Sequence, residues 1–85
     1  MFEEEDLDKE YDKSIQKIMK IDNLHNDILL IIYGLYKQIT VGDNTETPNF
    51  KTLKDKRKWE SWKYYSGCTS KHCKLELIDI VNALC

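Results

Sequence analysis

Apolar residues recur along this chain at spacings of three and four positions, which is the period of a helix that buries one face. The first such segment runs from about Asp8 to Ile21, and the second from about Leu24 to Thr40. A third is predicted from Leu53 to Tyr65 and a fourth from Ser70 to Leu84. The pattern therefore predicts an all-α fold, a four-helix bundle that forms a single domain over residues 1–85.

Three of the predicted helices carry a stripe of apolar side chains that we expect to face the core. The second helix is apolar on further sides as well, so it either lies centrally in the bundle or lines a ligand groove. The expected core positions, in chain order, are Leu7, Tyr11, Ile15 and Ile18, then Leu24, Ile28, Ile31 and Leu35, then Cys73, Leu77, Ile80, Val81 and Leu84.

Polar residues and glycines indicate where the helices begin and end. Asn23 or Asn26 is expected to cap the start of the second helix, and Thr69 the start of the fourth. Gly42 and Gly67 are expected to end the second and third helices. The connection after Gly42 has roughly ten residues, more than the two to eight usual between neighbouring helices. It is long enough for the third helix to run parallel to the second.

Charge is distributed unevenly along the chain. The 13 basic and 15 acidic residues give a net charge of −2, which argues against a protein that coats nucleic acid indiscriminately. Seven of the acids lie in residues 1–12, and we expect residues 1–8 to form a flexible acidic tail. Six of the bases lie in residues 51–63, so the net charge conceals a local basic patch.

The cysteines Cys68, Cys73 and Cys85 show no CxxC spacing. Free thiols in a reducing compartment are the favoured interpretation, and a zinc site that adds His72 to the three cysteines is the alternative. No signal peptide is visible, and the apolar run at residues 28–33 is too short to span a bilayer. We therefore expect a cytoplasmic protein without a metal or a membrane insertion.

Two groups of side chains on the predicted helices point to ligand binding. Tyr33, Tyr36 and Lys37 stand at positions i, i+3 and i+4, so they share one face near the end of the second helix. Lys54 and Lys58 share a face of the third helix. Lysines compensate phosphate charge and aromatic rings stack on bases, so these faces suit a phosphorylated nucleotide.

Trp59 and Trp62 lie one turn apart on the third helix and allow two interpretations. They are core anchors beside a solvated basic face, or they supply a surface on which a base stacks. Neither His25 nor His72 has an evident nucleophile beside it, and no glycine-rich loop cradles a phosphate. The sequence therefore predicts no catalytic residues and no cofactor.

The segment "LYKQITVGD", followed by "NT", a proline, "FK" and "KRKWESW", resembles the signature of the acyl-CoA-binding protein family. That signature reads roughly YKQATVGD-x-NT-x-x-P and then K-x-K-W-x-x-W. "EYDKS", "GCT" and "LIDIV" resemble further family segments, so the similarity extends from about Glu10 over nearly the whole chain. It implies an up-down-down-up bundle. It also implies cytosolic binding and transport of long-chain fatty acyl-CoA, such as palmitoyl- or myristoyl-CoA, without catalysis.

The resemblance also implies which residues contact the ligand. In the family, two tyrosines and three lysines surround the adenine and the 3′-phosphate, and apolar residues of the second helix line the acyl groove. Met19 stands where relatives carry a ligand-contacting lysine, and Leu77 where they carry a tyrosine that joins the nucleotide site. The predicted acyl-CoA site is Met19, Leu29, Leu30, Tyr33, Tyr36, Lys37, Lys54, Lys58 and Leu77.

Two alternatives from other functional classes remain. The basic segment 51–63 would suit a helical interaction or nucleic-acid-binding module, although the net charge disfavours it. A fragment of an enzyme that acts on acyl-CoA is disfavoured because no catalytic set is visible. We expect a monomer that does not bind nucleic acid.

Overall fold

The computed structural model describes residues 4–84, in which four helices are connected by loops. Helix α1 spans Glu4–Lys20, α2 spans Asn26–Thr40, α3 spans Leu53–Tyr64 and α4 spans Ser70–Leu84. The predicted all-α fold of four helices is confirmed. The predicted bounds of α4 match the structure, and those of the other helices differ at one or both ends.

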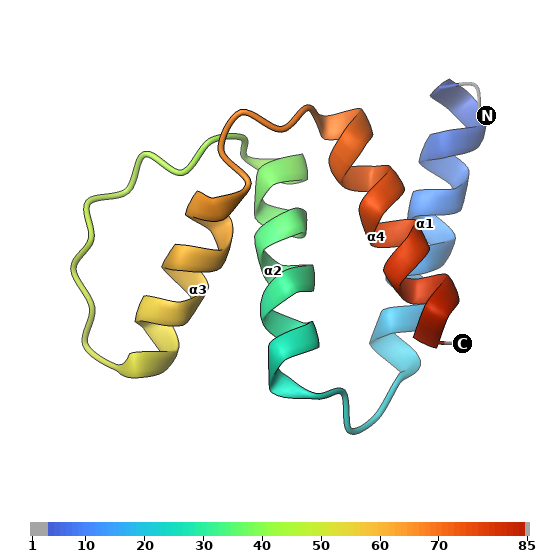
Figure 1. The fold of residues 1–85 in the computed structure, drawn as a ribbon. Helices are drawn as coiled ribbons and strands as arrows, with labels where there is room; N and C mark the ends of the chain where they lie inside the picture. The colour runs from blue at the N-terminus through green and yellow to red at the C-terminus, as the bar shows by residue number, and fades with distance from the viewer. Residues whose placement is uncertain (1–3, 85) are drawn as a thin grey trace.

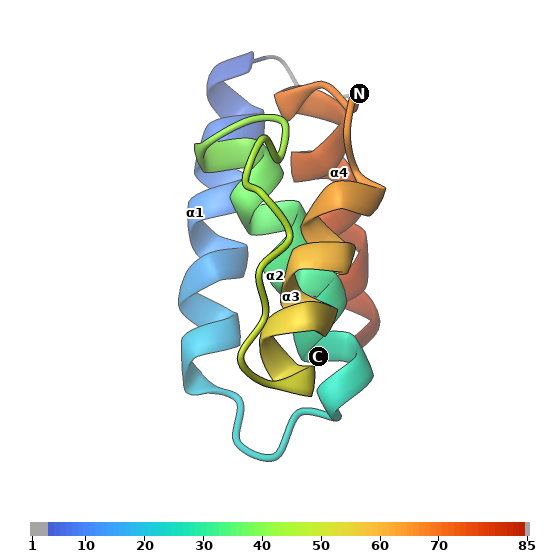
Figure 2. The ribbon, with the colours of Figure 1, turned by 90° about the vertical axis from the view of Figure 1, so that its left-hand side faces the viewer.

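Helix α2 occupies the centre of the bundle and is flanked by α3 on one side and α4 on the other (Figure 1). Helix α1 packs against α4. The chain runs down along α1, up along α2, up again along α3 and down along α4, so α2 and α3 are parallel. Viewed from the opposite end, this order is the predicted up-down-down-up topology. The long connection between α2 and α3 runs back along α3 and so allows the two helices to be parallel (Figure 2).

The core lies mainly between α2 and α4, where Ile32, Leu35, Cys73, Leu77 and Val81 form one buried cluster. Partly buried side chains of α1 also pack against this cluster, and these are Tyr11, Ile15 and Ile18. Burial of such side chains is the main contribution to the stability of a domain of this size.

Two predicted core positions are wrong. Ile31 is 40% exposed and Leu84 is 37% exposed, whereas Ile32 and Ile78 are buried in their place. Helix α2 carries isoleucines at both 31 and 32, which stand four and three residues before Leu35, so both spacings fit a helical stripe and packing against α4 selects Ile32. A helix that is apolar on several sides does not reveal from sequence alone which side faces the core.

The expected acidic tail is wrong for residues 4–8, because α1 already begins at Glu4. Leu7 is only 2% exposed, and the Asp8 carboxylate accepts a hydrogen bond of 2.7 Å from the Lys74 ammonium of α4. These contacts hold the first turns of α1 against the bundle. Residues 1–3, the rest of the predicted tail, lie outside the described residues.

The start of α2 is capped by a residue that the sequence analysis did not select. The His25 side chain accepts a hydrogen bond from the backbone N–H of Asp27, so His25 is the cap in place of Asn23 or Asn26. At the start of α4, Thr69 accepts from the backbone N–H of His72, which confirms the predicted cap. Gly42 and Gly67 both have positive φ angles beyond the helices that they follow, as expected.

Helix α3 is held against α2 by an unusually close approach of the two backbones. Gly34 of α2 faces Ser61 of α3, whose hydroxyl donates a hydrogen bond to the Leu30 carbonyl. A methyl group at Gly34 would lie 2.6 Å from the Ser61 carbonyl oxygen, so only glycine fits there. This contact fixes how far apart the two helices stand.

The tryptophans of α3 fasten the long connection to the helix. The Trp62 indole N–H donates to the Gly42 carbonyl, and that of Trp59 donates to the Glu46 carbonyl. The buried Asn44 side chain donates in turn to the Trp59 carbonyl. Trp62 is 3% exposed, so of the two predicted interpretations the structure supports the anchoring one.

Candidate functional site

A groove with a volume of about 610 Å³ lies between α2 and α3. This volume falls within the range of roughly 300–1,000 Å³ that is typical of small-molecule sites. One wall is the apolar and aromatic face of α2, and the other is the basic face of α3. Its lining residues are Asn26, Leu29, Leu30, Ile32, Tyr33 and Tyr36 from α2, with Leu53, Lys54, Arg57 and Lys58 from α3.

Most of the predicted site residues lie together in this groove. The six that line it are Leu29, Leu30, Tyr33, Tyr36, Lys54 and Lys58. The sequence analysis missed Asn26, Ile32, Leu53 and Arg57. Arg57 had a detectable signal, because it stands three residues after Lys54 and therefore shares its helical face.

Tyr33 and Lys58 form the wall between this groove and a neighbouring hollow. The Lys58 ammonium lies 5.4 Å from the centre of the Tyr33 ring, which is a cation–π distance. The neighbouring hollow, about 310 Å³, is bounded by the α2–α3 connection and by both tryptophans. Partial burial, followed by the charges of Glu46 and Asp55, raises the pKa of Tyr33. Its hydroxyl therefore stays protonated at neutral pH and is available as a hydrogen-bond donor.

Lys37 lies at the edge of this region and does not line the groove. Its ammonium sits 4.6 Å from the centre of the Trp62 ring. The side chain is half-buried, so the cation is positioned by the same tryptophan that anchors the α2–α3 connection. Lys37 and Tyr33 are one turn apart on α2, which keeps Lys37 within reach of a ligand bound at Tyr33.

Leu77 and Met19 lie outside the groove. Leu77 has no exposed surface and belongs to the core cluster with Cys73 and Val81, so its predicted place in the nucleotide site is wrong. The physical reason is the register of α4, whose positions 73, 77 and 81 all face inward. Met19 is 75% exposed on α1 and contributes nothing to the groove lining.

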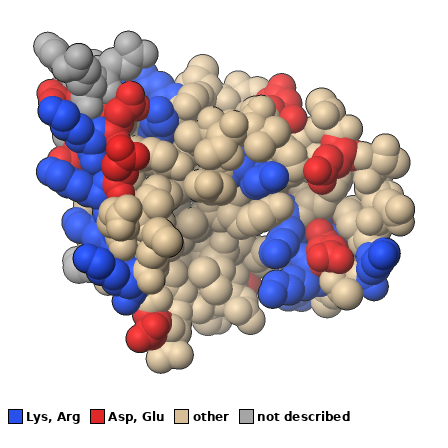
Figure 3. Space-filling view, turned by 180° about the vertical axis from the view of Figure 1, so that it is seen from behind, with Lys and Arg blue, Asp and Glu red and all other residues tan. Residues whose placement is uncertain are grey.

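The face of α3 that lines the groove is basic. The ion pairs of the described residues involve none of Lys54, Arg57 and Lys58. Seen from the side opposite to Figure 1, basic side chains gather over α3 next to a broad uncharged surface (Figure 3). A ligand that spans both regions needs an anionic part and an apolar part.

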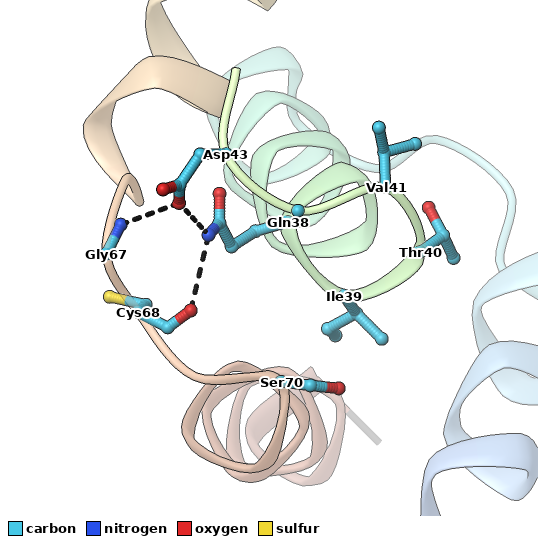
Figure 4. A pocket seen from close by; sticks show the side chains of 9 residues that line it. Gln38, Ile39, Thr40, Val41, Asp43, Gly67, Cys68 and Ser70 are labelled. Atoms are coloured by element: carbon cyan, nitrogen blue, oxygen red, sulfur yellow. Dashed lines mark hydrogen bonds between the residues drawn. The ribbon is translucent and has the colours of Figure 1, made fainter. Parts of the chain in front are cut away.

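A polar hollow of about 470 Å³ lies where the end of α2 meets the α3–α4 connection (Figure 4). The Gln38 amide donates to Asp43 at 2.7 Å and to the Cys68 carbonyl at 3.2 Å. The Gly67 N–H donates to the same Asp43 carboxylate at 2.8 Å. These bonds tie the two loops together, so the lining of this hollow has a structural role.

The Asp43 contacts predict a pH-dependent contribution to stability. The Gly67 N–H, then Gln38 and then the charge of Lys63 hold the pKa of Asp43 below its usual value. A depressed folded-state pKa stabilises the fold above the unfolded pKa of about 4, and this stabilisation disappears as pH falls through the folded pKa. Asp43→Asn should therefore lower the melting temperature at pH 7, and the difference from the unmodified protein should shrink below pH about 4.

Thermal melts monitored by circular dichroism between pH 2 and pH 8 would measure this effect. Asp22→Asn is the matched control, because Asp22 is exposed and makes no side-chain hydrogen bond or ion pair among the described residues. A destabilisation by Asp43→Asn that is the same at every pH would show that the charge of Asp43 contributes nothing.

The zinc site that the sequence analysis left as an alternative was considered among the described residues. Within residues 4–84, no three His, Cys, Asp or Glu side chains are grouped so that they could hold a metal ion. The proposed zinc set included Cys85, which lies outside the described residues. Cys73 is buried, and burial raises the pKa of its thiol to about 11. None of the described helices combines the length and hydropathy needed to cross a bilayer.

Comparisons with known proteins show which family the chain resembles and agree with the fold. The family described as Acyl CoA binding protein matches residues 8–81. The chain is 44% identical over 59 residues to the acyl-CoA-binding protein of Saccharomyces cerevisiae, which covers 68% of each protein. It is also 34% identical over 80 residues to acyl-CoA-binding domain-containing protein 3 of Oryza sativa, covering 92% of this chain and about half, 52%, of that protein.

A solved structure of a relative has the same architecture. The crystal structure of Oryza sativa acyl-CoA-binding protein 2 superimposes with a TM-score of 0.82 at 35% sequence identity, covering 92% of this chain and 89% of that one. The family match over residues 8–81 confirms the predicted resemblance and the expectation of a binding protein in place of an enzyme. This chain belongs to the acyl-CoA-binding protein family.

Proposed function

We propose that this protein binds long-chain fatty acyl-CoA esters in the groove between α2 and α3, and that it sequesters and carries them in the cytoplasm as a monomer. The observation that carries this proposal is the composition of the groove. The α2 wall, apolar and aromatic with Tyr33 and Tyr36, faces cations from α3 that make no ion pair among the described residues. A fatty acyl-CoA has the matching parts, an alkyl chain and a phosphorylated nucleotide.

The nucleotide end of the ligand is assigned to the region around Tyr33. The rings of Tyr33 and Tyr36 face the groove and offer stacking surfaces for adenine. Lys58, held over the Tyr33 ring, and Lys37, held over Trp62, would offset the charge of the 3′-phosphate. Both cations are half-buried, which reduces the screening of their charge by solvent.

The acyl end of the ligand is assigned to Leu29, Leu30 and Ile32, which lie toward the start of α2. Leu29 is 44% exposed in the structure, so a bound alkyl chain would remove apolar surface from water. The groove lies within one chain, which supports binding of one ligand per monomer.

Titration calorimetry with palmitoyl-CoA, palmitate and a single-stranded oligonucleotide tests this proposal. We expect saturable 1:1 binding of palmitoyl-CoA, much weaker binding of palmitate and no binding of the oligonucleotide. Tight binding of the oligonucleotide, with palmitoyl-CoA inert, would favour the nucleic-acid-binding alternative that the basic segment 51–63 suggested.

Lys58→Ala should weaken palmitoyl-CoA binding without unfolding the protein. Loss of a charge-assisted contact from a half-buried lysine costs about 1–2 kcal/mol, or roughly five- to thirtyfold in the dissociation constant. Lys56→Ala is the matched control, because Lys56 lies on the same helix, is exposed and does not line the groove. Equal dissociation constants for the two variants would remove Lys58 from the site.

A further inference from the structure

Thr47, in the connection between α2 and α3, has a hydroxyl group that the fold does not use. The hydroxyls of Thr52 and Thr69 cap helices, and that of Ser61 holds α3 against α2. Thr47, in contrast, is exposed and makes no side-chain hydrogen bond among the described residues. Its hydroxyl is therefore open to chemistry from outside the protein.

The backbone around Thr47 has the form that a protein kinase needs in a substrate. Residues 44–50 belong to no helix, and Pro48 follows Thr47 directly. A proline favours an extended conformation in the residue before it and itself has no backbone N–H. A proline directly after the hydroxyl residue is the feature that proline-directed kinases recognise. The sequence has a single proline, so Thr47 is its one hydroxyl residue in this context.

The contact that precedes Thr47 places it beside the ligand groove. The Glu46 carbonyl accepts a hydrogen bond of 2.9 Å from the Trp59 indole N–H, which fixes the chain against α3 directly before Thr47. Thr47 then lines the hollow of about 310 Å³ together with Tyr33 and Lys58. Both of these residues also line the ligand groove. A group attached to Thr47 would therefore lie at the end of the groove that we assign to the nucleotide.

A phosphate on Thr47 would change the electrostatics of this hollow. Among the residues that line it, Lys58 is the one cation, and Glu46 and Asp55 are acids. A phosphothreonine carries a charge of about −1.5 to −2 at pH 7 and pairs readily with a cation. It would compete for Lys58 with the 3′-phosphate of the ligand, and it would add to the negative charge of the two acids.

We propose that Thr47 is a phosphorylation site for a proline-directed protein kinase, and that phosphate on Thr47 weakens acyl-CoA binding. In this reaction the Thr47 hydroxyl oxygen forms a bond to the γ-phosphorus of ATP. The bond from that phosphorus to the oxygen that bridges it to the β-phosphate breaks, ADP leaves, and the hydroxyl proton passes to the catalytic carboxylate of the kinase. The modification site is independent of the proposed function, whereas its effect on the ligand rests on it.

Phosphorylation of the full chain with ATP and a purified cyclin-dependent or mitogen-activated kinase, both proline-directed, tests the site. Peptide mass spectrometry should find one phosphate, on Thr47. Pro48→Ala keeps the hydroxyl and should abolish the reaction. Thr45→Ala is the matched control, because it removes an exposed threonine of the same loop that no proline follows, and it should change nothing. No phosphate with either kinase, phosphate on another residue, or equal phosphorylation of Pro48→Ala would overturn the assignment.

Calorimetry on the phosphorylated protein tests the effect on the ligand. Palmitoyl-CoA should bind about five- to thirtyfold more weakly, because two phosphate groups repel each other across a partly solvated gap. The loss should shrink at high salt, which screens this repulsion. It should be absent for S-palmitoyl-pantetheine, which carries neither the 3′-phosphate nor the pyrophosphate. Thr47→Glu, with a single negative charge, should reproduce part of the loss.

Three outcomes would count against the regulation. Equal affinity of the phosphorylated and unmodified proteins for palmitoyl-CoA would show that the phosphate does not reach the site. An equal loss with the pantetheine thioester would mean that the phosphate obstructs the groove instead of repelling charge. If the unmodified protein fails to bind palmitoyl-CoA, the proposed function is wrong and the regulation falls with it, while the mass spectra still decide whether Thr47 is the modified residue.

Discussion

Palmitoyl-CoA should bind this protein more tightly than octanoyl-CoA by up to about 6 kcal/mol. The two ligands differ by eight methylene groups, and each methylene that is buried contributes about 0.8 kcal/mol. This figure is an upper limit, because the groove is open on one side and part of the chain stays in contact with water. Affinity should rise with chain length while apolar wall remains to be covered, and then level off.

A series of dissociation constants from octanoyl- to stearoyl-CoA would measure this dependence. Leu29→Asn should flatten the series, because Leu29 belongs to the apolar wall of the groove. Leu84→Asn is the matched control, since Leu84 is a partly exposed leucine on α4 that does not line the groove. A flat series for the unmodified protein would mean that it recognises only the nucleotide.

Gly34→Leu should destabilise the fold by about 3 kcal/mol or more and should also weaken ligand binding. The new Cβ would meet the Ser61 carbonyl oxygen at 2.6 Å and its carbonyl carbon at 2.8 Å. Backbone atoms cannot move aside as a side-chain end can, so α3 would have to shift away from α2. The groove lies between these two helices, and its shape depends on their separation.

Chemical denaturation, followed by calorimetry with palmitoyl-CoA, would measure both effects of the Gly34 substitution. Adding Ser61→Ala should recover little stability, because the hydroxyl is only one of the close atoms. Gly42→Ala is a useful comparison, since a Cβ at Gly42 meets nothing within 4 Å and is strained only by the φ angle of 102°. A Gly34→Leu variant as stable as the unmodified protein would show that the close approach is absent in solution.

The sequence predicted the helices because their apolar periodicity is strong. The long α2–α3 connection allowed α2 and α3 to run parallel, and the resemblance to the family implied the full up-down-down-up order. It did not determine which side of α2 faces the core. Adjacent isoleucines at 31 and 32 allow two registers, and only packing against α4 selects Ile32. The start of α1 was missed although Leu7 was an expected core position, because the acidic residues around Leu7 favoured a solvated tail and the contact of Asp8 with Lys74 of α4 is not visible in the sequence.

The residues predicted from the contiguous motif lie together, whereas the two predicted at departures from the family pattern, Met19 and Leu77, lie outside the groove. The residues of α2 and α3 that match the signature line one groove. Leu77 was placed by similarity to a tyrosine, but a leucine has no polar group to keep it at a site, and here it completes the core. Arg57 was not predicted as a site residue because the family motif specifies no residue type at its position.

The most direct test of the central claim is a titration of ¹⁵N-labelled protein with palmitoyl-CoA, followed by amide chemical shifts. If the groove between α2 and α3 is the binding site, the largest changes should fall on residues 26–37 and 53–58, and they should saturate at one ligand per chain. Changes concentrated around the polar hollow at Gln38, Asp43 and Gly67, or spread evenly with no saturation, would contradict it.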